Sequence, residues 1–362
     1  MRRLLAVCLL VLVLTGCGGE TARETAQPGT EPLELRYAQG FTVNLDREGR
    51  AFVTIQGGDR FQLVPQGLEP LEGQGTALFL PLQNIYLADS AAADLFAALN
   101  SLDLLRLTST KAADWSLPEL RERMEAGELG YAGKYNAPDY ELLLLEGVDL
   151  ALENTMLTHC PEVREELEEL GIPVLVERSS YEQHPLGRLE WIKLYGLLTG
   201  RLAQATAFFE EQAAVVEGLS SQDTGKTAAF FYVSANGSVV ARQGGDSVSR
   251  MMDLAGGRNV LAQRGETARS TVNMQAEAFF TQSREATILF YNATVDGGVD
   301  TLAELLDKAE WLAGCRAVET GQVWQAKADL FQQSSQAAQV IWELHRIFHG
   351  ETGELNFFHR LT

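Results

Sequence analysis

The sequence is poor in the residues that build metal centres and disulfide scaffolds. It has 4 cysteines and 5 histidines in 362 residues, too few cysteines for a disulfide-dense secreted domain. His345 and His349 have the i, i+4 spacing of a metal pair, but no carboxylate–histidine pattern accompanies them, so surface histidines are favoured over a metal site. The P-loop, the G-x-S-x-G motif and the H-E-x-x-H motif are all missing, which argues against those enzyme classes.

Positive charge is also scarce. The chain has 29 Lys and Arg against 49 Asp and Glu, a formal net charge of -20. An acidic surface repels nucleic acid and anionic lipid headgroups, and it suits solubility or attraction to a cationic partner. Hydrophobic residues make up 46% of the chain, so it can bury a core large enough for two ordinary domains.

The apolar run at the start of the chain is shorter than the roughly 20 residues that a transmembrane helix needs. Arg2 and Arg3 precede this run, 4–14, and Leu14-Thr15-Gly16-Cys17 closes it. The pattern predicts a lipoprotein signal peptide over residues 1–17, with lipid attached to Cys17 after cleavage. We therefore expect an extracytoplasmic protein anchored to the cell membrane, in a periplasm or on the outer face of a single membrane.

Two cysteines, Cys160 and Cys315, remain after Cys8 is cleaved off and Cys17 is lipidated. They are 155 positions apart, and their separation in space cannot be judged from sequence. A disulfide and two free thiols both stay open.

The mature chain divides into segments of different patterning. The predicted segments are a flexible tether (18–32), an N-terminal α/β lobe (33–185) that begins with a small β meander (33–65), a helical linker (186–219) and a C-terminal α/β lobe (220–362). Apolar strands alternate with helical patterns in both lobes, which predicts parallel sheets covered by helices. The predicted fold is therefore α/β, with two Rossmann-like lobes joined by a long helix and a ligand cleft between them.

Two local details of this prediction can be checked in a structure. Ser90 is the expected cap of a helix over 91–99, because serine before an apolar-periodic segment favours a helix start. The linker is expected to break once, at Thr199-Gly200, because glycine ends helices.

Several short segments are weak family signatures one by one, but their order and spacing together are more specific. They are G-K-Y at 133–135 leading to P-D-Y-E at 138–141, E-N-T-M at 153–156, E-R-S-S-Y-E-Q-H-P-L-G-R at 177–188 running on to E-W-I-K at 190–193, L-A-G-G-R-N-V at 254–260, and A-V with G-Q-V at 317–318 and 321–323. Together they resemble the iron-complex and cobalamin type of ABC-transporter substrate-binding lipoprotein, over roughly residues 31 to 350.

The resemblance implies a function and its partners. Such a protein captures an iron chelate (siderophore), haem or a corrinoid between its lobes as a monomer, with no cofactor of its own. It then delivers the cargo to a permease that an ATPase drives. In this family one carboxylate on each lobe pairs with permease arginines, and Glu141 and Glu277 match those positions. Exposed acids of this kind can steer a cationic partner.

Candidate ligand residues follow from the rule that α/β sheets bind ligands beyond the carboxyl ends of their strands. The residues that this rule and the resemblance select are Lys134, Tyr135, Glu153, Met156, Tyr181, His184 and Arg188 in the first lobe, and Asn236, Arg242, Tyr291 and Lys327 in the second. The cations would hold carboxylate or catecholate oxygens. The tyrosines would stack on a macrocycle or ligate ferric iron.

Each of these residues also has a structural alternative. The tyrosines can be packing residues, His184 can cap the helix that follows it, and Arg188 can form a surface ion pair with Glu182 or Glu190. Two other functions stay open as well. A chelatase-like enzyme on the same fold would turn over a tetrapyrrole, and a sensory lipoprotein would bind no small ligand.

Overall fold

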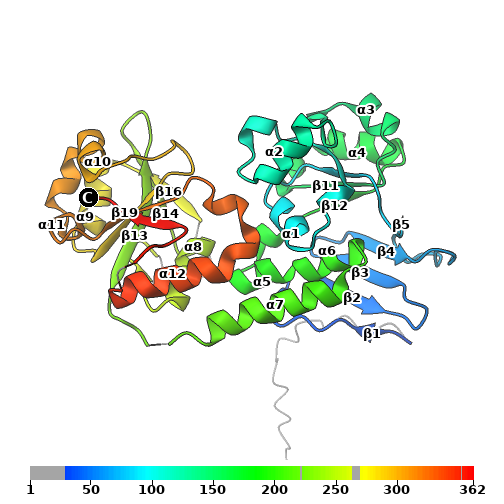
Figure 1. Ribbon diagram of the computed structural model, residues 1–362, viewed down its shortest axis with the longest axis horizontal. Helices are drawn as coiled ribbons and strands as arrows, with labels where there is room; N and C mark the ends of the chain where they lie inside the picture. Colours follow the sequence, from blue (N-terminus) through cyan, green and yellow to red (C-terminus); the bar gives the residue numbers. More distant parts are fainter. Residues whose placement is uncertain (1–28, 221, 263–269, 352) are drawn as a thin grey trace, which may run out of the picture.

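The computed structural model describes residues 29–220, 222–262, 270–351 and 353–362. The predicted signal peptide, the lipidation residue Cys17 and most of the tether lie outside the described residues. The described chain forms two α/β lobes, with a small extra β-sheet at the far end of the first lobe (Figure 1). The predicted α/β fold class is confirmed.

The extra sheet contains five strands in sequence order. They are β1 (Glu31–Pro32), β2 (Phe41–Leu45), β3 (Ala51–Ile55), β4 (Arg60–Val64) and β5 (Thr76–Phe79). The first four pair antiparallel, whereas β5 pairs parallel to β4. The sheet is thus larger than the meander expected over 33–65, and β1 lies in the stretch expected to be tether.

The sheet of the N-terminal lobe is entirely parallel, as predicted. Its order is β12 (Val174–Val176), β11 (Leu150–Glu153), β6 (Ile85–Leu87), β7 (Leu105–Thr108) and β8 (Gly130–Tyr131). Its helices are α1 (Ala93–Ala98), α2 (Pro118–Glu125), α3 (Tyr140–Leu145) and α4 (Pro161–Glu169), and a two-stranded hairpin contains β9 (Gly133–Lys134) and β10 (Ala137–Pro138). The strands are short and, apart from the edge strand β8, mostly buried, as expected of a sheet covered by helices.

The start of α1 differs from the prediction. The N-cap position of α1 is Ala92, which has no side-chain cap, and Asp89 rather than Ser90 caps the turn before it: Asp89 Oδ1 accepts hydrogen bonds from the backbone N–H groups of Ala91 and Ala92, at 2.8 and 3.3 Å. Aspartate and serine are about equally good caps. Local sequence therefore could not decide between these neighbours.

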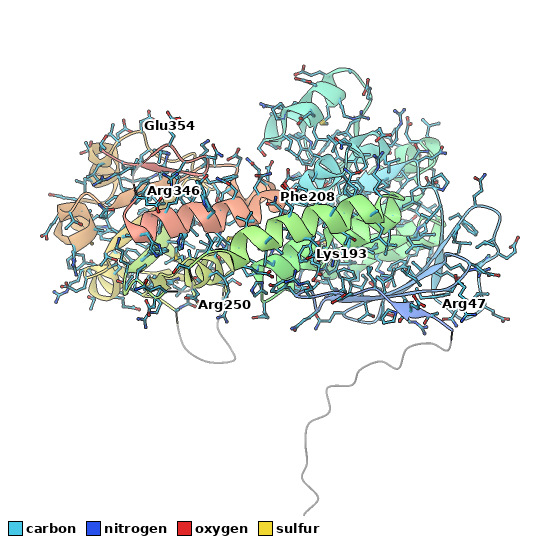
Figure 2. All side chains as sticks on the ribbon, turned by 60° about the horizontal axis from the view of Figure 1, so that its bottom comes forward. Arg47, Lys193, Phe208, Arg250, Arg346 and Glu354 are labelled. Carbon is cyan, nitrogen blue, oxygen red and sulfur yellow. The ribbon has the colours of Figure 1, made fainter. Side chains whose placement is uncertain are left out.

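Three helices form the linker: α5 (Pro185–Glu190), α6 (Ile192–Leu198) and α7 (Leu202–Glu217). The predicted break at Thr199-Gly200 is present, where Gly200 has a φ of 68°. A second break, at Trp191, was not predicted. Helix α7 lies against α12 (Ala337–His349), and the two run along the length of the molecule (Figure 2).

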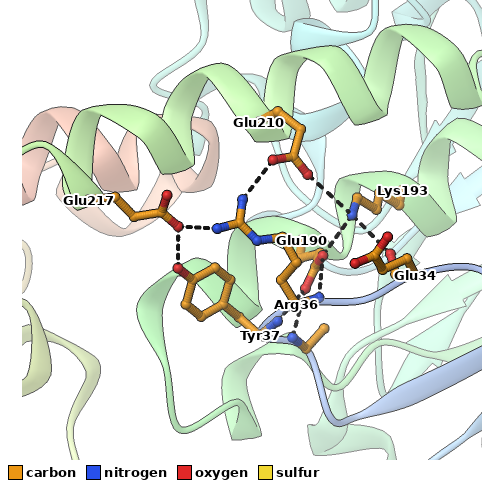
Figure 3. Close-up of polar contacts among 8 residues, drawn as sticks. Glu34, Arg36, Tyr37, Glu190, Lys193, Glu210 and Glu217 are labelled. Carbon is orange, nitrogen blue, oxygen red and sulfur yellow. Dashed lines mark hydrogen bonds and ion pairs between the residues drawn. The ribbon is translucent and has the colours of Figure 1, made fainter.

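A buried glutamate fastens the N-terminal segment to this linker (Figure 3). Glu190 is fully buried and accepts hydrogen bonds from the backbone N–H groups of Arg36, Tyr37 and Ala38 at 2.8–2.9 Å. The Lys193 ammonium donates to the same carboxylate at 2.7 Å. Residues around Tyr37 were expected to be a strand, but the carboxylate takes the N–H groups that a strand ladder would need.

The C-terminal lobe has a mixed sheet. Its order is β16 (Thr271–Met274), β14 (Val239–Arg242), β13 (Thr227–Val233), β17 (Ile288–Asn292), β18 (Val323–Ala326) and β19 (Phe358–Arg360), and β15 (Arg258–Asn259) also pairs with β13. The centre is parallel, as predicted, whereas β14, β16 and β19 each pair antiparallel with their neighbours. Its helices are α8 (Ser247–Leu254), α9 (Ala276–Ser283), α10 (Leu302–Lys308), α11 (Arg316–Glu319) and α12.

The described residues also form seven short 3₁₀ helices. They are η1 (Leu102–Leu104), η2 (Ala112–Asp114), η3 (Thr155–His159), η4 (Ser179–Tyr181), η5 (Glu310–Gly314), η6 (Leu330–Gln332) and η7 (Ser334–Gln336). Cys160 and Cys315 are both free thiols, and Cys315 is buried. Among the described residues, no helix has the length and apolar character needed to cross a bilayer.

One hydrophobic core runs through the extra sheet, the first lobe, the linker and one face of the second lobe. Trp191 and Phe209 of the linker belong to the same buried cluster as Phe96 of the first lobe and Phe290 of the second. Close-packed interiors resist deformation. The lobes are therefore joined by packed side chains as well as by the chain itself.

Candidate functional site

A pocket lies between the two lobes, at the point where the linker begins. Its lining residues are Pro185 and Arg188 of α5, Ser247, Val248 and Met251 of α8, Leu330, Phe331, Gln333 and Ser334 of the segment after β18, and Ala337 and Val340 of α12. Most of this lining is apolar, with one guanidinium, two hydroxyls and one amide. The lining resembles that of small-molecule sites, but the cavity of about 40 Å³ is far smaller than the roughly 300–1,000 Å³ of pockets that enclose a ligand.

Arg188 connects the two lobes across this pocket. Its Nη1 donates a hydrogen bond to Ser247 Oγ at 2.8 Å. The linker brings Arg188 there because α5 starts just before it, with Pro185 in the first turn. Ser247 is the first residue of α8, whose cap Asp246 accepts a hydrogen bond from the Val248 N–H at 2.9 Å.

Arg242 lies behind the pocket wall. Its Nη1 donates to Asp246 Oδ2 at 2.9 Å, and its guanidinium carbon lies 4.7 Å from the centroid of the Phe331 ring. Phe331 lines the pocket. Asp246 therefore caps α8 and also neutralises Arg242. The cation–π contact of Arg242 holds the Phe331 ring in place at the pocket.

The segment between β18 and α12 also holds the first lobe. Gln332 Oε1 accepts hydrogen bonds from Ser116 N at 2.9 Å and Ser116 Oγ at 2.6 Å, and its Nε2 donates to the carbonyl of Asp114 at 3.0 Å. Close by along the chain, the N–H of Ser335 donates to Asp94 Oδ2 at 2.7 Å. Burial raises the pKa of Asp94. These contacts fix one pocket wall to the opposite lobe.

Buried acids occupy the carboxyl ends of the first lobe's strands. Glu153 is fully buried, and neither of its oxygens has a hydrogen-bond partner among the described residues. Burial raises its pKa to about 8, with a smaller contribution from the charge of Asp89. Burial also raises the pKa of Glu177 to about 8, helped by Asp89 and opposed by Arg188. Glu153 was predicted to be a ligand residue, but in this structure it does not reach solvent.

Two other predicted residues have partners within the protein. The Tyr291 hydroxyl, buried at the end of β17, donates to Asp296 Oδ2 at 2.5 Å and accepts from Lys308 Nζ at 3.0 Å. Burial and the hydrogen bond to Asp296 raise the pKa of Tyr291. His184 Nδ1 accepts a hydrogen bond from the Leu186 N–H at 3.1 Å, so His184 caps helix α5, which was the structural alternative to ligand binding. Burial lowers the pKa of His184. Its ring stacks on Tyr37 with centroids 4.5 Å apart.

The remaining predicted residues lie mostly on the surface. Lys134 (β9), Met156 (η3), Tyr181 (η4), Asn236 (the turn after β13), Lys327 (after β18), Glu141 (α3) and Glu277 (α9) are exposed, and Tyr135 is half-buried beside the core of the first lobe. Of the predicted ligand residues, Arg188 lines the pocket, and Arg242 lies behind Phe331, which lines it. His345 and His349 lie with ring centroids 3.9 Å apart. The described residues bring no three metal-ligating side chains together as a metal site.

Sequence reasoning missed several residues at the pocket. Ser247 and Phe331 reach it through tertiary packing, and no local motif marks them. Asp89 comes two positions after β6, so the rule on strand ends could have selected it.

Comparisons with known proteins found a matching family and a relative. Residues 88–330 match the model of a family described as periplasmic binding protein. An uncharacterized lipoprotein of Methanocaldococcus jannaschii is 24% identical over 366 aligned positions, covering 94% of this chain and 90% of that protein.

Solved structures extend the likeness to the fold. A periplasmic heme binding protein from Pseudomonas aeruginosa superimposes with a TM-score of 0.59 at 16% identity, covering 78% of this chain and 99% of that one. A protein of an ABC-type Fe3+-hydroxamate transport system from Saccharomonospora viridis superimposes with a TM-score of 0.53 at 19% identity, covering 73% and 93%. The extra sheet before residue 88 precedes the matched family region.

Proposed function

This chain belongs to the periplasmic binding protein family, and we propose that it is an extracytoplasmic lipoprotein that captures a metal chelate or tetrapyrrole for an ABC importer. The cargo classes are an iron chelate (siderophore), haem and a corrinoid. The related proteins are binding proteins rather than enzymes.

The observation that carries this proposal is the pocket shared by the two lobes. With a cavity of about 40 Å³, its apolar lining would contact one edge or substituent of a chelate or macrocycle, and Arg188 would pair with a carboxylate or another anionic oxygen of that cargo. Guanidinium groups bind such oxygens with two parallel hydrogen bonds. Ser247 and Gln333 supply further polar groups from the second lobe, so one ligand can contact both lobes at once.

Intrinsic tryptophan fluorescence of the full chain tests this assignment. The protein is titrated with haemin, cyanocobalamin, a ferric hydroxamate and a ferric catecholate. We expect saturable quenching by one of these classes. Arg188→Ala should weaken that binding about tenfold or more, since a hydrogen bond to a charged group is worth about 1.5–3 kcal/mol.

Arg250→Ala is the matched control for Arg188→Ala. Arg250 is an exposed arginine on α8, the helix that carries Ser247, but it does not line the pocket. Its removal should leave affinity unchanged. Absence of quenching by all four probes would contradict the proposed cargo classes. Equal weakening by both arginine variants would instead place the bound molecule outside the pocket.

We further propose that Glu141 and Glu277 contact the permease. Both are exposed acids in the first turn of a helix, one on each lobe, where they can meet cationic side chains. Charge reversal tests this: Glu141→Lys and Glu277→Lys should each reduce stimulation of the transporter's ATPase while cargo affinity stays at the wild-type value. Unchanged stimulation in the double variant would refute the docking role.

Anchoring through Cys17 is the last part of the proposal. The supporting observations are the predicted signal peptide and the likeness to a lipoprotein. Fatty acid labelling in cells should mark the wild-type chain and leave Cys17→Ala unlabelled. Labelling of both proteins would contradict lipid attachment at this residue.

A further inference from the structure

The connection between β1 and β2 lies against the linker and does not pair as a strand. We call its last five residues, 36–40, the strap; they lead directly into β2. All five backbone N–H groups of the strap donate to two side-chain carboxylates, those of Glu182 and Glu190. Glu190 accepts from the first three at 2.8–2.9 Å, and Glu182 accepts from the last two at 2.7–3.0 Å. Two side chains therefore take the place of a strand partner.

The two glutamates stand at the two ends of α5. Glu190 is the last residue of this helix, and Glu182 lies three positions before its start. Both are buried, and each also holds the chain that follows α5: Trp191 Nε1 donates to Glu182 at 2.9 Å, and Lys193 Nζ donates to Glu190 at 2.7 Å. A buried carboxylate is stable only when several donors surround it. The strap supplies most of those donors.

The strap also contacts α5 between these ends. The Tyr37 ring stacks on His184, the cap of α5, with centroids 4.5 Å apart. A Cβ at Gly187 would lie 3.0 Å from the Tyr37 carbonyl oxygen, and a Cβ at Gly40 would lie 2.9 Å from Glu182 Oε1. Glycine at both positions therefore allows the strap and α5 to approach closely.

The strap reaches the other two linker helices as well (Figure 3). On α6, Lys193 Nζ donates to Glu190 and also to the Glu34 carbonyl, just before the strap, at 3.1 Å. On α7, Glu210 accepts from Arg36 Nη1 at 2.7 Å. The pair on α7 is partly exposed and contributes little stability. The strap thus joins three helices that the linker itself separates by two breaks, and its buried contacts are those with α5.

Arg188 depends on α5 for its place in the pocket. It lies two positions before the end of α5 and lines the pocket, where its Nη1 reaches Ser247 of the opposite lobe at 2.8 Å. A helix of six residues has little stability of its own, so its packing partners fix its position. The strap is one of these partners, and it lies outside the matched family region, 88–330.

We propose that the strap positions Arg188 in the pocket, with Glu182 and Glu190 as positioning residues that act through α5. With the strap seated, the guanidinium meets Ser247 and is held ready for an anionic group of the cargo. With the strap detached, α5 loses its partners at both ends, and Arg188 leaves this place. The role in cargo binding rests on the function proposed above, whereas the position of Arg188 can be tested without cargo.

The first measurement uses the full chain without cargo. Nitrogen NMR of arginine side chains follows Arg188, whose signal Arg188→Lys assigns, and amide hydrogen exchange follows the strap and α5. Glu190→Gln should speed exchange in both segments and remove the hydrogen-bonded Arg188 signal, as Ser247→Ala should. Glu211→Gln, at an exposed position of α7, should match the wild type in both measurements. Faster strap exchange with an unchanged Arg188 signal would overturn the positioning role, and unchanged strap exchange would overturn the attachment.

Gly40→Ala keeps the proposal falsifiable if Glu190→Gln does not fold. This change leaves both carboxylates in place and crowds the strap away from Glu182. It should speed exchange of the strap and remove the hydrogen-bonded Arg188 signal. A strap that exchanges faster in Gly40→Ala while the Arg188 signal persists would again overturn the positioning role.

The second measurement uses the probe that quenches the tryptophan fluorescence, in a double-mutant cycle of Glu190→Gln with Arg188→Ala. Glu190→Gln alone should weaken binding about threefold to tenfold, because the guanidinium is displaced. In the Arg188→Ala background it should have no further effect, because positioning acts only through that side chain. Equal weakening in both backgrounds would indicate a general structural defect and overturn the positioning role. If none of the four probes quenches, the cargo classes fail, and the NMR and exchange results still decide what positions Arg188.

Discussion

Replacing Glu153 by glutamine should stabilise the protein, and increasingly so as the pH rises. Glu153 has no exposed surface, and its carboxyl oxygens have no partner among the described residues. Its pKa rises from 4.5 to about 8 on folding, chiefly by burial. The folded state therefore keeps a proton that the unfolded chain releases, so stability falls as the pH rises from about 4.5 toward about 8.

The magnitude follows from this pKa difference. One pKa unit corresponds to about 1.4 kcal/mol, so the ionisable side chain costs under about 1 kcal/mol at about pH 5 and about 3 kcal/mol at about pH 7. The cost levels off above about pH 8, at about 5 kcal/mol. Glutamine is neutral at every pH and has nearly the same shape, so Glu153→Gln should remove this dependence.

Denaturant unfolding at several pH values measures the effect. The difference in unfolding free energy between Glu153→Gln and the wild type should grow by about 3 kcal/mol from about pH 5 to about pH 8. Glu165→Gln on exposed α4 is the matched control and should show no such trend. If the difference for Glu153→Gln is the same at all pH values, the side chain is not held neutral by burial, and the reasoning is refuted. A constant offset added to the pH-dependent difference would come from hydrogen bonds made by the glutamine amide.

Three other substitutions test the architecture. Glu190→Gln should destabilise the protein by about 3 kcal/mol in denaturant unfolding, because it removes the buried charge partner of the Lys193 ammonium and leaves the longer ion pair to Glu210, at 3.9 Å; Glu211→Gln, at an exposed position of α7, should change little, and an equal effect of the two substitutions would contradict this role of Glu190. Gly257→Ala should lower the melting temperature strongly, because a Cβ there would lie 2.2 Å from Phe348 Cζ; an unchanged melting temperature would mean that α12 can shift. Tyr291→Phe should cost about 1 kcal/mol of stability and leave affinity for the quenching probe unchanged, whereas a loss of affinity matching that of Arg188→Ala would place Tyr291 in the ligand site.

The parts of the fold that local periodicity encodes could be predicted from the sequence. Strands such as β11 and β13 are short buried apolar runs, and α7 carries helical spacing over its whole length. The strands that were missed depend on distant partners. β19 is three residues near the chain end that pair with β18, and β16 pairs with β14. No local pattern signals such pairings, because partner strands supply their stability.

The candidate site was predictable only in outline. The rule on strand ends led to the sheet edge of the first lobe where Glu153 and Glu177 lie, but neither residue lines the pocket. The pocket itself depends on α8 and the segment before α12, which fold back against the linker. Arg188 was found because it belongs to a distinctive block of sequence. Ser247, its partner 59 positions later, could not be found from spacing.

The shared core limits how the two lobes can move. Because buried side chains of the linker pack against both lobes, a wide hinge opening would have to break close-packed contacts, which costs more than a few hydrogen bonds. Adjustment should therefore be concentrated at the polar contacts between the lobes, Arg188 with Ser247 and Gln332 with Ser116. Each such bond contributes about 1 kcal/mol, so gaining or losing one changes an affinity by about fivefold to tenfold.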